Sequence, residues 1–134
     1  MRWQKKLVRA TNQTRGTTLG DRIRVADNGL TQVVGLLGER GLSAGDGLLI
    51  LPSQGVHTWG MLFPIDVVVL DNDWNIIAIR RAMGPFRMTR VFFKAAAVLE
   101  LPSGTVDASS TAVGDAITFA RVSLDVSGAP SSKV

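Results

Sequence analysis

The sequence predicts a mainly β, single-domain protein, a β-sandwich of jelly-roll-like type with one or two short helices. Its apolar runs are short and are separated by Gly, Pro, Asp and Asn, which is typical of strands joined by tight turns. With 134 residues, 46% of them hydrophobic, the chain has enough apolar surface for one continuous core. A membrane-spanning helix needs about 20 consecutive apolar residues. No run of that length is present, so we expect no transmembrane segment.

The basic residues are concentrated near the N-terminus. Residues 1–24 contain seven Lys or Arg and one acid, whereas the remaining chain has eight basic and ten acidic residues. We expect a basic N-terminal arm over residues 1–11, one β domain over residues 12–124 and a flexible tail over residues 125–134. An arm of this kind more often lies in solvent than on nucleic acid.

The chain has no cysteine and a single histidine. The lack of cysteine excludes disulfides, thiolate metal sites and cysteine nucleophiles, and we expect no metal and no cofactor. The first ten residues lack the apolar run of a secretory signal. The chain as written is therefore expected in the cytoplasm, or outside it if a signal peptide has been removed from its start.

Three Gly-Asp pairs each precede a short aliphatic run. Glycine accepts positive φ, and an Asp side chain can accept hydrogen bonds from nearby backbone amides. We therefore expect turns that lead into strands at Gly20-Asp21, Gly45-Asp46 and Gly114-Asp115.

A hairpin is expected in the middle of the chain. Residues 66–70 are the clearest strand, with β-branched residues on both faces, and residues 71–75 turn the chain before residues 76–79 return. Residues 95–101 begin with three alanines, which favour helix, but their flanking loops favour a strand. Four side chains of the hairpin are expected to be largely buried: Val67, Val69, Ile77 and Ile79.

Two helices are expected. Residues 29–39 place apolar side chains on one face at helical spacing. Ser103 or Thr105 is expected to cap a short helix that runs to about Thr111, before Gly114.

Two motifs fail on inspection. Asp71, Asp73 and Asn75 resemble the start of a calcium loop, but Ile76 and Ala82 occupy the positions of its glycine and its bidentate glutamate. Residues 51–55 lack the first glycine of a nucleophile elbow.

The segment from residue 56 to residue 66 has the highest concentration of candidate functional groups. A histidine can exchange protons near neutral pH and a carboxylate can orient it, so His57 with Asp66 or Glu100 is one candidate pair. The alternative gives all three structural roles. In it His57 is partly buried and hydrogen-bonded to protein, Asp66 accepts hydrogen bonds from loop amides, and Glu100 faces solvent. We favour the structural alternative, with ligand contact secondary.

Residues 80–94 form a basic segment with five Lys or Arg, three Phe and no acid. Such a segment could hold phosphates and stack bases. Alternatively, Phe92 and Phe93 anchor a long loop on the core while the arginines face water. We favour the loop, because no recognised nucleic-acid module accompanies the charges. A carboxylate-bearing ligand or an acidic partner would suit the same residues.

Several short motifs occur in an order that resembles one family, the uncharacterised domain of unknown function number 192. The resemblance covers about residues 12–122 and rests on the ordered set rather than on any single motif. The motifs lie at residues 12–17, 35–38, 47–50, 56–61, 64–68, 98–104 and 113–115.

The resemblance implies a compact, mainly β domain, without implying a substrate, a cofactor or catalytic residues. Many members have a Trp-Met-Lys-Asn-Thr-like run where this chain has residues 60–63, so any function of that Lys and Asn is missing here. A hairpin glycine of many members aligns with Trp74, and we therefore expect the turn of this chain to avoid positive φ.

We expect a small binding or accessory module, without catalysis of its own, whose site lies in or beside residues 56–66. One alternative is a hydrolase- or lyase-like enzyme that uses His57 with Asp66 or Glu100. Another is a nucleic-acid-binding module over residues 80–94, although we expect no specific nucleic-acid binding. The expected partner is a small ligand or an acidic protein. The candidate ligand-binding residues are His57, Thr58, Met61, Asp66, Arg87 and Glu100.

Overall fold

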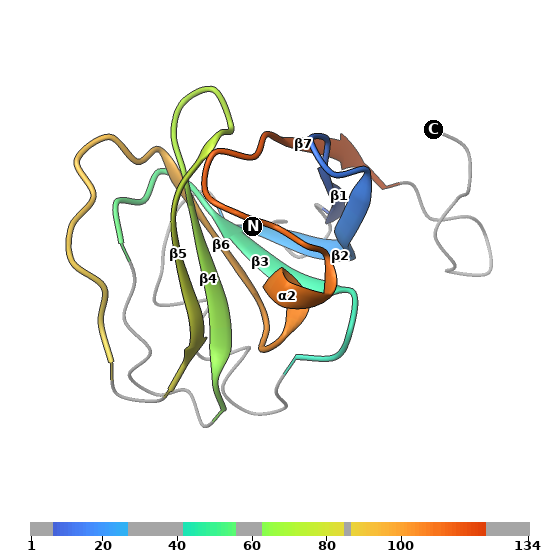
Figure 1. Ribbon diagram of the computed structural model, residues 1–134, viewed down its shortest axis with the longest axis horizontal. Helices are drawn as coiled ribbons and strands as arrows, with labels where there is room; N and C mark the ends of the chain where they lie inside the picture. Colours follow the sequence, from blue (N-terminus) through green and yellow to red (C-terminus); the bar gives the residue numbers. More distant parts are fainter. Residues whose placement is uncertain (1–6, 27–41, 56–62, 85–86, 123–134) are drawn as a thin grey trace.

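The computed structural model describes residues 7–26, 42–55, 63–84 and 87–122 of the chain. Seven strands form one sheet in the order β5-β4-β6-β3-β2-β1-β7 (Figure 1). A single short helix, α2 (Thr105–Ala108), follows β6 within these ranges. The strands are β1 (Leu7–Asn12), β2 (Thr17–Ala26), β3 (Asp46–Ile50), β4 (Ile65–Leu70), β5 (Ile76–Met83), β6 (Ala97–Pro102) and β7 (Ile117–Arg121).

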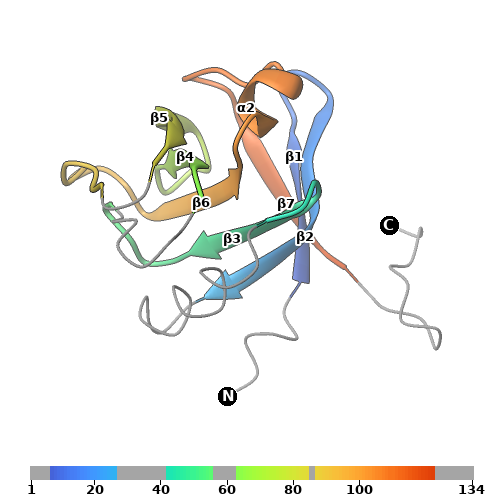
Figure 2. The same cartoon turned by 90° about the horizontal axis from the view of Figure 1, so that it is seen from below.

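The sheet curls until its two ends meet. Figure 2 shows β5 and β4 at one end, β1 and β7 at the other, and α2 on the open side. An isolated bridge joins Asn75, before β5, to Ala116, before β7. The N–H of Ile76 also donates to the carbonyl of Asp115 at 2.9 Å. The curl therefore closes at the tip of the β4–β5 hairpin.

The prediction of a mainly β single domain is confirmed, but the sandwich is not what the strand pairing forms. The parallel pair β2–β3 connects both halves of the chain into one continuous sheet. A curled sheet and two stacked sheets bury the same alternating residues, because both cover one face of every strand. The hydrophobic pattern predicts the strands and does not distinguish these two arrangements.

Apolar side chains fill both faces of the sheet. The inner cluster, inside the curl, contains residues of all seven strands and Val106 of α2. The outer cluster lies on the other face of β3, β6, β4 and β5 and includes Phe92 and Ala95 from the segment before β6. β4 contributes to both clusters and is buried along its whole length, as predicted.

The buried hairpin residues follow from the place of each strand in the sheet. Val67 and Val69 of β4 are fully buried, which confirms the prediction for them. Ile77 and Ile79 are only partly buried and pack against the edges of the two clusters. They lie on β5, which is an edge strand of the sheet order and pairs with β4 on one side only.

Two of the three Gly-Asp turns are confirmed. Gly45 has φ +90° before β3, and Gly114 has φ +98° before β7. The prediction of a turn at Gly20-Asp21 was wrong, because β2 continues through both residues. Position 20 requires glycine because the space around it is too small for a side chain. A Cβ there would lie 2.7 Å from Cδ1 of Ile23 and 2.8 Å from the carbonyl oxygen of Gly45.

The β4–β5 hairpin is confirmed, but its turn corrects one expectation. Trp74 has φ +65°, so this chain keeps the positive φ that the glycine of many relatives allows. The carboxylate of Asp71 holds the turn by accepting hydrogen bonds from the N–H groups of Asp73 and Asn75, each at 2.9 Å. The ring of Trp74 packs edge-on against Phe119 of β7, with centroids 5.0 Å apart.

The chain from residue 95 to residue 111 forms a strand and a helix, as expected, but the helix ends at Ala108 rather than at about Thr111. β6 ends at Pro102 and α2 follows, but neither Ser103 nor Thr105 caps the helix, because its N-cap residue is Gly104 and has no side chain for the purpose. β1 begins at Leu7, so residues 7–11, which were expected in the N-terminal arm, belong to the sheet. The helix expected over residues 29–39 and the tail lie outside the described residues.

Candidate functional site

The structure separates the two candidate acids. Asp66 pairs with Leu101, whereas Glu100 pairs with Val67 on β4 and Leu48 on β3. Successive side chains of a strand point to opposite faces, so Asp66 and Glu100 lie on opposite sides of the sheet. Three further candidates, His57, Thr58 and Met61, lie outside the described residues.

Asp66 is engaged entirely with backbone amides. Its carboxylate accepts hydrogen bonds from Ala82 at 2.8 Å, Gly104 at 3.1 Å and Val106 at 2.9 Å. Gly104 and Val106 are the N-cap and second residue of α2, whose own side chains supply no cap. Asp66 is 1% exposed, and three charge-assisted hydrogen bonds match its buried charge. This geometry is that of a structural residue which holds the helix on β4.

The hydrogen bond from Ala82 to Asp66 lies at a bulge in β5. Ile65 pairs with Met83 and Val67 with Arg80, so Arg81 and Ala82 both lie opposite Asp66. Ala82 has φ +49°, a strained conformation for a residue with a Cβ, and its N–H points to Asp66. The bulge places two residues of β5 opposite one residue of β4. Arg80 and Arg81 diverge because successive side chains of a strand point to opposite faces.

Glu100 lies in an apolar setting on the outer face. It is 3% exposed, so the expectation that it faces solvent was wrong. No residue in the described part of the chain forms a hydrogen bond or ion pair with its carboxyl group. Burial in this setting raises the pKa of Glu100 to about 8, because the charged form is poorly solvated. Glu100 is therefore protonated, and neutral, at neutral pH.

Glu100 shares a row across the sheet with Arg80. The paired residues run Leu48, Glu100, Val67 and Arg80 across β3, β6, β4 and β5. Directly paired side chains lie on one face, so the carboxyl group and the guanidinium are on the same side of the sheet. Two strand spacings, about 10 Å, separate their Cα atoms. Arg80 is held elsewhere: it donates to the carbonyl of Ile79 at 2.9 Å and lies over the ring of Phe92 at 5.3 Å.

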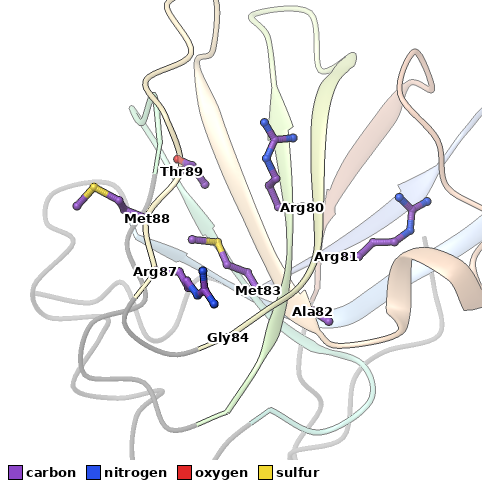
Figure 3. Close-up of a pocket in the computed structure, with 8 residues that line it drawn as sticks. All are labelled: Arg80, Arg81, Ala82, Met83, Gly84, Arg87, Met88 and Thr89. Carbon is purple, nitrogen blue, oxygen red and sulfur yellow. The ribbon is translucent and has the colours of Figure 1, made fainter.

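A cavity of about 460 Å³ opens beside Arg80, between the end of β5 and the segment that follows it. Arg81 turns away from it toward α2, where it forms an ion pair with Asp107 at 2.9 Å (Figure 3). Three arginines and two methionines are in the lining, and no acid. The lining residues are Arg80, Arg81, Ala82, Met83, Gly84, Arg87, Met88 and Thr89. Of the predicted ligand residues, the cavity includes Arg87 and neither Asp66 nor Glu100.

A buried polar network that the sequence did not single out lies at the far end of the curl. Asn12 donates to Thr111 at 3.0 Å and to Asp115 at 2.9 Å. Asp115 also accepts from Arg15 at 3.0 Å and from the N–H of Ala112 at 2.9 Å. The hydrogen bond from Arg15, and next that from Asn12, lower the pKa of Asp115 to about 2. Since protein groups satisfy these atoms, the network ties the β1–β2 turn to the loop before β7 and leaves no reactive group.

Metal and membrane features are absent from the described ranges. No group of three or more His, Asp or Glu in them is arranged to hold a metal ion. No helix in the same ranges is long and apolar enough to cross a bilayer.

Comparison with solved structures supports the fold. A protein from Sinorhizobium meliloti 1021, described as a "putative transcription regulator", is similar with a TM-score of 0.69 and 22% identity, over 85% of this chain and 92% of that one. A protein of unknown function from Novosphingobium aromaticivorans DSM 12444 is similar with a TM-score of 0.67 and 19% identity, over 83% of this chain and 82% of that one. At these identities the likeness shows the fold alone.

Comparison of sequences shows the family. A UPF0127 protein of Thermococcus sibiricus is 29% identical over 113 residues, which are 81% of this chain and 72% of that protein. The model of the DUF192 family, described as "Uncharacterized ACR", matches residues 10–119. This match covers most of the chain and confirms the resemblance seen in its motifs: the protein belongs to the DUF192 family.

Proposed function

We propose that the protein is a binding module for a small organic anion, held in the cavity beside Arg80. The observation that carries the proposal is the cavity lining, which combines arginines and methionines without an acid. Its volume of about 460 Å³ is in the range of small-molecule sites. A ligand with one carboxylate or phosphate and a short apolar body matches this lining.

The individual side chains have distinct roles in this proposal. Arg80 is oriented before binding, because its guanidinium is held by the Ile79 carbonyl and the Phe92 ring. A planar guanidinium can bind a carboxylate or phosphate through two parallel hydrogen bonds. Met83 and Met88 provide flexible, polarisable contacts for the apolar part of the ligand. Arg81 contributes less, because Asp107 already neutralises it.

Binding is proposed rather than catalysis because the described acids do not form an acid–base pair. Asp66 is engaged with three amides, and Glu100 lies on the opposite face of the sheet. A hydrolase- or lyase-like role would rest on His57, which lies outside the described residues.

The test compares four probes that share one alkyl chain: hexanoate, hexyl phosphate, hexanol and hexylammonium. A ligand that binds only the native state raises the melting temperature. We expect hexanoate and hexyl phosphate to raise it and hexanol and hexylammonium to leave it unchanged. Isothermal titration calorimetry of the two anions gives their affinities. Stabilisation by the ammonium probe, or by no probe, would contradict the proposal.

Matched arginine variants locate the site. Arg80→Gln and Arg87→Gln are expected to lower the affinity for hexanoate about tenfold or more, since each loses a charge-assisted hydrogen bond worth about 1.5–3 kcal/mol. Arg24→Gln is the control, because Arg24 is also an exposed strand arginine but lies on β2. Equal losses in all three variants would indicate a general charge effect and overturn the assignment of the cavity.

Nucleic acid is a second candidate partner, favoured by the run of five basic residues without an acid over residues 80–94 and by the description of the S. meliloti relative. We expect only weak, non-specific binding, because no recognised nucleic-acid module is present. Fluorescence anisotropy with a duplex and a single strand, over a range of salt, measures it. Tight, sequence-selective binding at physiological salt that Arg87→Ala with Arg90→Ala abolishes would replace the anion proposal.

A further inference from the structure

A turn next to the cavity exposes apolar side chains among basic ones. Phe93 is 83% exposed, Met88 65% and Val91 51%. These three, with the exposed Arg90 and Lys94, are called the turn surface below. In the described part of the chain, the large hydrophobic residues that remain exposed are Met88, Val91, Phe93 and Val113. The segment lies at the periphery of the molecule in both views (Figures 1 and 2).

The exposure of Phe93 is built into the fold. Its neighbour Phe92 is 4% exposed and packs in the outer cluster. Phe92 therefore anchors the segment on the core, whereas the ring of Phe93 lies outside it. The N–H of Ala95 donates to the carbonyl of Phe92 at 2.9 Å, which closes a turn with Phe93 and Lys94 at its tip. Gln54 holds the turn from both sides: its carbonyl accepts from Phe92 at 2.8 Å, and its side chain donates to Phe93 at 3.0 Å.

The charge around this tip is of one sign. Between Asp73 and Glu100 the sequence has five basic residues and no acid. Arg90 is placed by its stacking on Phe92, with its guanidinium carbon 4.2 Å from the ring centroid. A protruding aromatic side chain flanked by cations is suited to the boundary of a bilayer, where the ring enters the acyl region and the cations remain among the headgroups.

We propose that the turn surface docks the protein on a membrane that contains anionic phospholipid. Phe93, Val91 and Met88 would enter the interface, and Arg90 and Lys94 would contact lipid phosphates. Each cation near such a surface strengthens binding about fivefold. Nucleic acid would use the cations and could stack on Phe93, but it gives no role to Val91 and Met88. The proposal goes beyond the anion site, because Phe93 and Lys94 do not line the cavity.

Sedimentation with vesicles tests the proposal. We expect the protein to bind vesicles of phosphatidylcholine with phosphatidylglycerol, and to bind pure phosphatidylcholine at least tenfold more weakly. Phe93→Ser is expected to weaken binding roughly tenfold or more, since it removes a large apolar side chain from the interface. Lys94→Glu is expected to weaken it by more than the fivefold of a simple charge removal.

Two variants elsewhere are the controls. Val113→Ser removes an apolar side chain that is 60% exposed, and Arg121→Glu reverses an exposed charge on β7. Both are expected to bind vesicles like the parent. Absence of vesicle binding, survival of binding in Phe93→Ser, or equal losses in the controls would overturn the proposal, as would tighter Phe93-dependent binding to an oligonucleotide or to polyglutamate. Hexanoate binding by Phe93→Ser shows separately whether the anion site is intact.

Discussion

The carboxylate of Asp66 accepts a hydrogen bond from the backbone N–H of Val106 at 2.9 Å, although the two residues are 40 positions apart. Asp66 therefore performs for α2 the task that a side chain at the helix start usually performs. The same carboxylate binds Ala82 of the β5 bulge. One buried acid thus holds both the helix and the bulge of β5.

Asp66→Asn is expected to lower the free energy of unfolding by about 3 kcal/mol. The amide retains one acceptor oxygen, so at least one backbone N–H is left without a partner, and the charge-assisted bonds are lost. Urea denaturation measures the change. Asp73→Asn, at an exposed position of the hairpin tip, is the control and should change stability by less than about 0.5 kcal/mol. Equal stability of both variants would show that Asp66 does not hold α2.

Glu100 should make the protein less stable as pH rises from about 4.5 to about 8. Its pKa in the folded protein, about 8, is above the ordinary glutamate value of 4.5. The folded state therefore retains a proton that the unfolded state releases, and this contribution to stability is complete below pH 4.5 and lost above pH 8. Within that window the slope is about 1.4 kcal/mol per pH unit.

Glu100→Gln isolates this effect. Glutamine resembles the protonated acid in shape and does not titrate, so the variant should lack the slope and be more stable than the parent above pH 8 by on the order of 5 kcal/mol. Denaturation of both proteins at a series of pH values gives the difference. A difference that is constant from pH 5 to pH 9 would contradict a buried, protonated Glu100.

Trp74→Gly should destabilise the hairpin even though it removes a strained conformation. The left-handed φ of Trp74 costs about 1–2 kcal/mol, which glycine would recover. Loss of the partly buried ring and its contact with Phe119 costs about 3 kcal/mol or more, so the net loss is about 1–2 kcal/mol. Trp74→Phe, which keeps an aromatic ring at the same φ, is the comparison. A glycine variant more stable than the parent would reverse this balance.

Val69→Ala should lower stability by about 1–3 kcal/mol through lost burial and a residual cavity. Val69 is fully buried in the outer cluster on a strand with both faces covered. The measurement is the denaturation midpoint at an unchanged dependence on denaturant. Val113→Ala, at a position 60% exposed, should move the midpoint little.

The sequence predicts the local elements well where the signal is local. The β-branched run of β4, the glycines of two turns and the strand over residues 97–102 are all recognisable without a structure. The parallel pairing of β2 with β3 cannot be recognised in this way, because the hydrophobic patterns of both strands would also suit pairing with other strands. The bulge opposite Asp66 is also not recognisable from the sequence. Its residue at positive φ is Ala82, and alanine rarely adopts that conformation, so the residue type gives no indication of it.

The candidate site was only partly predictable for similar reasons. The basic segment and Arg87 were identified from charge, but the role of Asp66 depends on α2 reaching β4. Glu100 stands between two leucines, and alternation predicts only that it lies opposite them. Whether that opposite face is exposed or buried depends on how the segment before β6 folds back, since its Phe92 and Ala95 pack in the outer cluster.

The bridge between Asn75 and Ala116 also affects how the protein can meet other chains. An open sheet offers unpaired amides and carbonyls along its first and last strands, and these are the usual templates for an added strand and for aggregation. Here the start of β5 and the start of β7 are bonded to each other's flanking residues, with Ile117 donating to Trp74 at 2.9 Å and Gly114 to Ile76 at 2.8 Å. Templated growth from this end would first require the curl to open, so the seam protects the starts of the two outermost strands.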